Sequence, residues 1–136
     1  MTAERALRAR GDRFAIATPH AAATRAGLEA FDAGGTAVDA GVTACAVLAV
    51  VYPHMCSIGG DLFALVGRPG GEVVAVNGSG AAPAAVDPEA LRREHGRMPL
   101  TGPHAIMVPG VLAGWRALLD FEGRRGWPRP SAQPCG

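Results

Sequence analysis

The sequence predicts a mixed α/β fold of the α+β type, and three observations lead to this class. Strand-like and helix-like apolar runs follow one another in the order strand, helix, helix, strand, strand, helix, strand, helix. Two of the strands, residues 61–66 and 72–76, are separated by the turn-forming residues GRPGG, which is typical of an antiparallel hairpin. Hydrophobic residues make up 49% of the 136 residues, enough to bury the core of one domain.

The first half of the chain predicts one strand and two helices. The strand is FAIAT, residues 14–18, and the first helix covers residues 21–33, where a glycine pair follows as a left-handed C-terminal cap. Thr36 and Asp39 resemble a capping box before a second helix, at about residues 37–51. That helix is apolar almost all round, which indicates burial on most of its sides.

The second half predicts a helix, a strand and a last helix after the hairpin. Asp87 is a suitable N-cap for a helix over residues 88–95, with Pro88 at the first helical position. The run AIMV, residues 105–108, is interpreted as a strand, and residues 111–121 carry apolar side chains at helical spacing.

Composition divides the chain into three segments. Residues 1–13 are interpreted as a leader and residues 14–121 as the folded part. Residues 122–136 contain three prolines, three glycines and almost no apolar pattern, so we expect an irregular tail that cannot close a core.

Charge and apolar content narrow the partners and the location. Thirteen basic and twelve acidic residues give a formal net charge of +1, which argues against nucleic acid or an anionic membrane as partner. No secretory signal is seen, and the longest apolar run, residues 40–51, is shorter than the about 20 residues that span a bilayer, so we expect a cytoplasmic protein. Cys45, Cys56 and Cys135 lack metal-type spacing, and we expect neither a metal nor a cofactor.

The glycine-rich stretch CSIGGDLF, residues 56–63, lies between a helix and a strand. A phosphate-binding loop has its glycines after a strand and before a helix, so the reversed order favours close backbone approach over phosphate binding. Asp61 is either a turn-forming carboxylate, which we favour, or a polar group that faces a site. Cys56 is expected to be an inert thiol.

The other reactive side chains do not form a complete active site in the sequence. The four histidines show no ligand-pair spacing, and His20 and His54, which each follow a proline, are expected to have local structural roles. The segment NGSGA, residues 77–81, lacks the spacing of a G-x-S-x-G nucleophile elbow. We therefore assign no catalytic residue.

Five short motifs in a fixed order resemble the gamma-glutamyltransferase family, also called gamma-glutamyl transpeptidases or glutathione hydrolases. The stretch ATPHAAATRAGLEAFDAGGTAVDAGVTACAVLAVVYPHMCSIGGDLFALV is similar to the opening region of the family. The segments APAA (82–85) and MVPGVLAGW (107–115) follow in the family's order, and the likeness covers roughly residues 14–121.

The resemblance implies an N-terminal-nucleophile hydrolase fold, an αββα sandwich of which only the N-terminal portion is present. Family members cut themselves into a large and a small subunit, and the new N-terminal Thr of the small subunit forms an acyl-enzyme. This chain has no Thr-Thr pair. We therefore expect it to correspond to the beginning of the large subunit and to be inactive alone.

The resemblance also points to a substrate-binding site in the segment NGSGAAP. Aligned on its Ala-Pro pair, the family's Arg-Glu pair falls on Ser79 and Gly80, which we assign as candidate substrate-binding residues. The family's Arg grips the α-carboxylate of a glutamyl substrate, whereas serine carries no charge. Asp61 and Leu62 likewise stand where the family commonly has two more glycines. We therefore expect a different acyl group.

The leading interpretation is an N-terminal fragment of a gamma-glutamyltransferase-like enzyme, which transfers or hydrolyses gamma-glutamyl or related amides through a Thr that is absent here. Its expected partners are a small acyl amide substrate and a missing small subunit. The alternative is a non-catalytic binding or structural α/β module that associates with a partner chain. A nucleotide-binding domain that uses SIGG is disfavoured by the reversed order of its elements.

Overall fold

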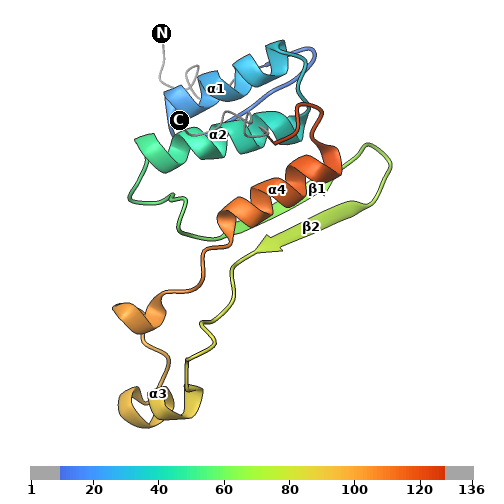
Figure 1. The fold of residues 1–136 in the computed structure, drawn as a ribbon. Helices are drawn as coiled ribbons and strands as arrows, with labels where there is room; N and C mark the ends of the chain where they lie inside the picture. The colour runs from blue at the N-terminus through green and yellow to red at the C-terminus, as the bar shows by residue number, and fades with distance from the viewer. Residues whose placement is uncertain (1–9, 128–136) are drawn as a thin grey trace, which may run out of the picture. The chain divides into compact units, whose positions relative to one another are not determined.

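The computed structural model describes residues 10–127, in which four α-helices, one short 3-10 helix and a two-stranded sheet occur (Figure 1). These residues divide into two compact units. Unit 1 comprises the described residues up to Ser57 and those from Trp115 onward, and unit 2 comprises Ile58–Gly114. The predicted mixed α/β class is confirmed, while the bounds of leader, folded part and tail stay predictions.

Unit 1 is built on two helices that lie side by side (Figure 1). The bounds of α1 (Ala21–Asp32) and α2 (Ala37–Val51) agree with the sequence prediction to within a residue. Ala23 of α1 packs against Ala44 and Leu48 of α2 in a buried cluster. Small side chains at this contact let the two backbones approach closely. Four partly buried side chains surround the cluster: Ile16, Val47, Tyr52 and Cys56.

Local hydrogen bonds fix where both helices begin. His20 precedes α1, and its Nδ1 accepts the backbone N–H of Ala22 at 3.2 Å. The Thr36 hydroxyl accepts the backbone N–H of Asp39 at 3.2 Å, and the Asp39 carboxylate accepts the backbone N–H of Thr36 at 2.8 Å. The predicted capping box and the structural role of His20 are confirmed. The left-handed glycine after α1 is Gly34, with φ +83°.

The last helix, α4 (Val111–Glu122), begins in unit 2 and continues into unit 1. Trp115, Leu118 and Leu119 are buried at helical spacing, as the apolar pattern of the sequence predicts. The chain after α4 then returns to the beginning of α2.

Asp39 holds this returning segment. Its carboxylate accepts the backbone N–H groups of Arg124 at 2.9 Å and Arg125 at 3.2 Å. The two guanidinium groups donate to the carbonyls of Gly34 and Ala33 at the end of α1, at 3.4 and 3.0 Å. Burial of Asp39, which is 3% exposed, favours a raised pKa, but the hydrogen bonds from Thr36, Arg124 and Arg125 outweigh it and lower the pKa of this carboxyl.

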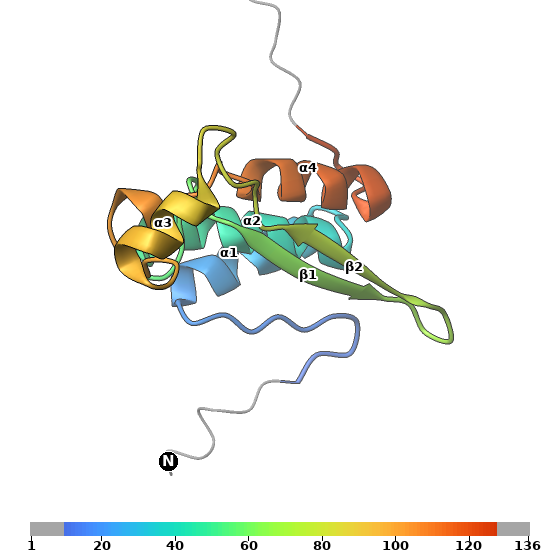
Figure 2. The same cartoon turned by 90° about the horizontal axis from the view of Figure 1, so that it is seen from below.

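Unit 2 contains the predicted hairpin, which forms a twisted ribbon (Figure 2). Strand β1 (Leu62–Gly67) pairs antiparallel with β2 (Val73–Gly78), with Leu62 opposite Gly78. Burial alternates along both strands, as a period of two requires. Phe63 and Leu65 point to the open face and are 66% and 76% exposed. A sheet face that meets water normally carries polar side chains, so this apolar face is unusual.

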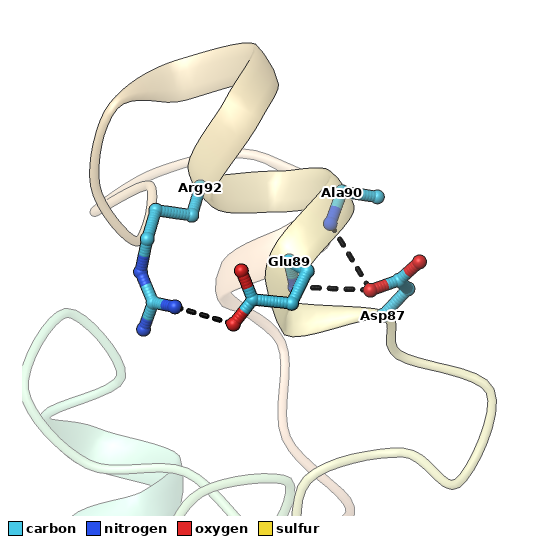
Figure 3. A network of polar contacts seen from close by, with 4 residues as sticks. All are labelled: Asp87, Glu89, Ala90 and Arg92. Atoms are coloured by element: carbon cyan, nitrogen blue, oxygen red, sulfur yellow. Dashed lines mark hydrogen bonds and ion pairs between the residues drawn. The ribbon is translucent and has the colours of Figure 1, made fainter.

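Helix α3 (Pro88–His95) shows how closely the local sequence dictates a helix start. One oxygen of the Asp87 carboxylate accepts the backbone N–H groups of Glu89 at 2.9 Å and Ala90 at 3.0 Å (Figure 3). Glu89 also pairs with Arg92 on the next turn, at 2.5 Å. The predicted N-cap is therefore confirmed.

Two predicted strands are not formed. Residues 14–18 have no regular secondary structure. In the second segment, Ala105 ends the 3-10 helix η2 (Pro103–Ala105), and residues 106–108 follow it without entering a sheet. A strand needs a ladder of backbone hydrogen bonds. In the second segment the N–H of Val108 makes one such bond, to the carbonyl of Ala81 at 3.0 Å.

The apolar residues of the first segment have a different use. The ring of Phe14 stacks on that of Phe31 in α1, with centroids 4.4 Å apart, and Ile16 packs against the helical core. The apolar side chains of residues 14–18 therefore pack against helices, and the segment does not pair with a strand.

Candidate functional site

Unit 2 contains a hollow of about 250 Å³ between two turns and an apolar segment. It is lined by residues 59–61, which precede β1, by Ser79, which follows β2, and by residues 105–108. The first two linings belong to the glycine-rich turn and the small-residue turn that stand out in the sequence. The structure therefore brings both turns to one place.

Backbone contacts at glycines hold the turn that carries Ser79. Gly80 has φ +75°, and a side chain there would collide with the carbonyl oxygen of Val108. A Cβ on Gly110 would collide with the carbonyl oxygen of Gly78 and would lie 2.5 Å from the backbone nitrogen of Gly80. Main-chain approach, and not side-chain packing, thus sets the course of the chain after β2.

The turn that carries Asp61 is tied to the same place. The carbonyl of Gly60 accepts two backbone N–H groups, from Gly110 at 3.0 Å and from Val111 at 3.1 Å. Gly110 therefore meets both turns. Asp61 follows Gly60, whose carbonyl is hydrogen-bonded, and Ser79 precedes Gly80, whose backbone lies close to that of Val108. These contacts fix the backbone positions of Asp61 and Ser79 on the wall of the hollow.

The two candidate substrate-binding residues behave differently. Ser79 is half-buried and lines the hollow, and its backbone N–H donates to Asn77 Oδ1 at 3.0 Å. Within residues 10–127 its hydroxyl has no hydrogen-bond partner. Gly80 does not line the hollow and serves the conformation of the turn. A role of either residue in binding substrate stays a prediction.

Asp61 is the charged side chain of the lining within the described part of the chain. It is exposed and takes part in none of the ion pairs that join residues between positions 10 and 127. Its place in the lining favours the alternative of a polar group facing a site over a turn-forming carboxylate. The lining thus combines one acidic residue, one serine and an apolar segment.

Between positions 10 and 127, the cysteines and histidines lie outside this lining. Burial, together with the nearby Cys56, raises the pKa of the Cys45 thiol, so Cys45 stays protonated at neutral pH. Cys56 is half-buried beside the core of unit 1, and Cys135 lies outside the described residues. The ring of His54 contacts that of Tyr52, with centroids 4.2 Å apart.

Metal ligands do not gather in the described part of the chain: no group of three or more His, Cys, Asp or Glu side chains there is placed to hold an ion. Across the same residues, no helix combines the length and the apolar character that crossing a membrane requires.

A mixed α/β chain whose glycine-rich turns meet at one hollow fits a known enzyme family. Residues 23–130 match the family model described as gamma-glutamyltranspeptidase, and the chain belongs to this family. It is 40% identical over 111 residues to the oxamate amidohydrolase proenzyme of Klebsiella pneumoniae, a match that covers 78% of this chain and 21% of that protein. It is also 40% identical over 116 residues to the glutathione hydrolase-like YwrD proenzyme of Bacillus subtilis, covering 84% and 22%.

Solved structures agree with this assignment. The gamma-glutamyltranspeptidase of Helicobacter pylori is similar with a TM-score of 0.76 and 30% identity, over 85% of this chain and 34% of that one. The cephalosporin acylase of Bacillus halodurans is similar with a TM-score of 0.67 and 36% identity, over 76% and 19%. The chain spans 21% and 22% of its two curated relatives above, so the whole sandwich stays a prediction.

Sequence reasoning missed one wall of the hollow, residues 105–108, and the part played by Gly110. Both lie in or beside the motif MVPGVLAGW, which the family resemblance uses for alignment only. The Pro-Gly step in that motif was the available signal, because a glycine after a tight turn often marks close backbone approach.

Proposed function

We propose that this chain supplies the acyl-binding part of an enzyme that transfers or hydrolyses an amide whose acyl group is not gamma-glutamyl. The observation that carries the proposal is Ser79, which lines the hollow at the position where the family resemblance expects a substrate-gripping Arg. No cation among the described residues lines this hollow in its place.

The energetic difference is large enough to change specificity. A hydrogen bond to a charged group contributes about 1.5–3 kcal/mol, which is about tenfold to a hundredfold in affinity. A serine hydroxyl replaces only part of this contribution, because it carries no charge. A substrate that depends on an α-carboxylate therefore loses its main contact at this position.

The relatives support an amide-cleaving activity with varied acyl groups. Their names include an oxamate amidohydrolase, glutathione hydrolases and acylases, several of them as proenzymes. An N-terminal Thr is the nucleophile that the family resemblance implies. None of the six threonines of this chain stands in a Thr-Thr pair, so the nucleophile comes from a polypeptide segment beyond this sequence.

A chimera tests the proposal. The 111 matched residues of the Klebsiella pneumoniae oxamate amidohydrolase proenzyme are replaced by those of this chain, and the rest of the relative supplies the catalytic half. We expect the chimera to cleave itself and to release ammonia from small amides, with little turnover of a gamma-glutamyl anilide. The matched variant Ser79→Arg is expected to raise turnover of the anilide by about tenfold or more.

Two results contradict the proposal. One is turnover of gamma-glutamyl anilide by this chain alone, above that of a blank preparation. The other is a chimera that prefers the gamma-glutamyl anilide to every small amide while it still carries serine at position 79.

A second candidate function rests on the open face of the hairpin. Phe63, Leu65 and Val73 leave apolar side chains exposed there, 66%, 76% and 64% respectively. Such a face is typical of a surface that a partner covers, which fits a non-catalytic module that associates with another chain. Size-exclusion chromatography and hydrogen exchange on the purified chain separate the two functions, because a cooperative, well-protected monomer favours the module.

A further inference from the structure

We infer that the hollow of unit 2 selects amides whose acyl group carries a protonated amine and rejects those that present a carboxylate to it. This inference rests on the proposed function and names its substrate class. Asp61 is the group that discriminates, and Ser79 assists as an uncharged hydrogen-bonding group.

This preference follows first from the charge of the residues that line the hollow. Within residues 10–127 the lining includes one acidic residue, Asp61, and no Lys, Arg or His. That carboxylate is not neutralised by an ion pair in the same part of the chain. A ligand ammonium in the hollow is therefore attracted, and a ligand carboxylate is repelled.

The shape of the ligand follows from the other walls. Ile106, Met107 and Val108 offer a partly exposed aliphatic surface, which suits a short methylene chain. The unpartnered hydroxyl of Ser79 both donates and accepts, so it can bind the amide group or a second polar atom. A volume of about 250 Å³ fits a small molecule and not a folded partner.

The wall is set before a ligand arrives. The carbonyl of Gly60 is held by Gly110, and the backbone at Gly80 lies so close to Val108 that a side chain at position 80 would collide with the Val108 carbonyl oxygen. Binding therefore does not have to order the two turns. Because no free energy is lost in ordering them, the difference in affinity between charged and neutral ligands is not reduced by that cost.

Three small amides of different charge test the inference on the full 136-residue chain. Glycinamide is a cation at pH 6.5, acetamide is neutral and oxamate is an anion. Their dissociation constants are measured at low salt by the shifts of the ¹⁵N–¹H signals of residues 59–61, 79 and 105–108. We expect glycinamide to bind about three- to fivefold more tightly than acetamide, oxamate to bind most weakly, and the preference to shrink in 0.5 M salt.

Two variants show whether Asp61 is responsible. Asp61→Asn is expected to give glycinamide and acetamide equal affinity. Glu72→Gln removes the same charge from the exposed hairpin loop of unit 2, outside the lining, and is expected to keep the preference. Unchanged signals outside the hollow confirm that each variant is folded.

The inference is overturned if oxamate binds as tightly as glycinamide, if Asp61→Asn keeps the preference, or if none of the three amides shifts these signals. These outcomes are distinct from failure of the proposed function, which is read from turnover by the chimera. If the chimera is active but the 136-residue chain binds the three amides without a charge preference, only the inference fails. If the chain binds the amides with the expected charge preference but the chimera is inactive, only the proposed enzymatic function fails.

Discussion

Two aspartates of this chain differ in almost every physical respect. Asp39 in unit 1 is 3% exposed and accepts hydrogen bonds from Thr36, Arg124 and Arg125, whereas Asp61 in unit 2 is exposed and has no ion-pair partner in the described part of the chain. A carboxylate whose oxygens are satisfied internally stabilises the fold. A carboxylate that lines a hollow without a partner is available to a ligand.

Because of this contrast, we expect Asp39→Ala to be much more damaging than a substitution of Asp61. It removes the acceptor of four donor groups, and three of these are backbone N–H groups, so we expect a loss of about 3 kcal/mol in the free energy of unfolding. The measurement is urea unfolding followed by the helical circular-dichroism signal. Asp12→Ala, at an exposed position, is the control and is expected to change stability by less than about 0.5 kcal/mol. Equal effects of the two variants would contradict the structural role of Asp39.

The charge of Asp39 predicts a pH dependence. Because its pKa is lower in the folded chain than in the unfolded one, Asp39 contributes stability above the unfolded pKa, and this contribution disappears as the pH falls through the folded pKa. We expect the difference in urea midpoint between wild type and Asp39→Asn to be constant near neutral pH and to shrink in acid, below about pH 4. A difference that grows on acidification would show that the pKa is raised instead.

Gly80→Ala tests whether backbone contacts hold the hollow. Its positive φ and its collision with Val108 predict a loss of about 2–4 kcal/mol. Gly70→Ala has a similar φ, +69°, with no atom within 4 Å, so we expect it to lose only about 1 kcal/mol. Urea unfolding and the ¹⁵N–¹H signals of residues 59–61 report the effect. If both variants lose the same free energy of unfolding, the close backbone approach at Gly80 does not contribute to stability.

Asp61→Asn is expected to change stability least, by less than about 0.5 kcal/mol in the same urea experiment. An exposed carboxylate without an ion-pair partner contributes little to folding. A loss above about 1 kcal/mol would show that Asp61 has a structural partner after all, and the contrast with Asp39 would fail.

Local features of this chain could be predicted from the sequence. Asp87 before Pro88, and Thr36 three residues before Asp39, identify two helix starts because every partner lies within one turn. The hairpin follows in the same way from its five-residue turn.

Long-range features could not be predicted in the same way. The bonds from Arg124 and Arg125 reach Asp39 across 85 and 86 residues, and no local pattern announces them. The apolar residues 105–108 have strand-like composition, but strand pairing depends on a neighbour that composition does not reveal. The meeting of Asp61 and Ser79 at one hollow likewise depends on Gly110, which lies about thirty residues beyond Ser79 in sequence.

The glycine contacts also bear on how such a protein diversifies. Gly60, Gly80 and Gly110 hold the two turns through main-chain atoms, which are the same in every residue type. Positions 61 and 79 therefore accept new side chains with little effect on folding, as long as the three glycines remain. Under the proposed function, a lineage that keeps this scaffold can exchange one acyl preference for another by single substitutions, without passing through a sequence that fails to fold.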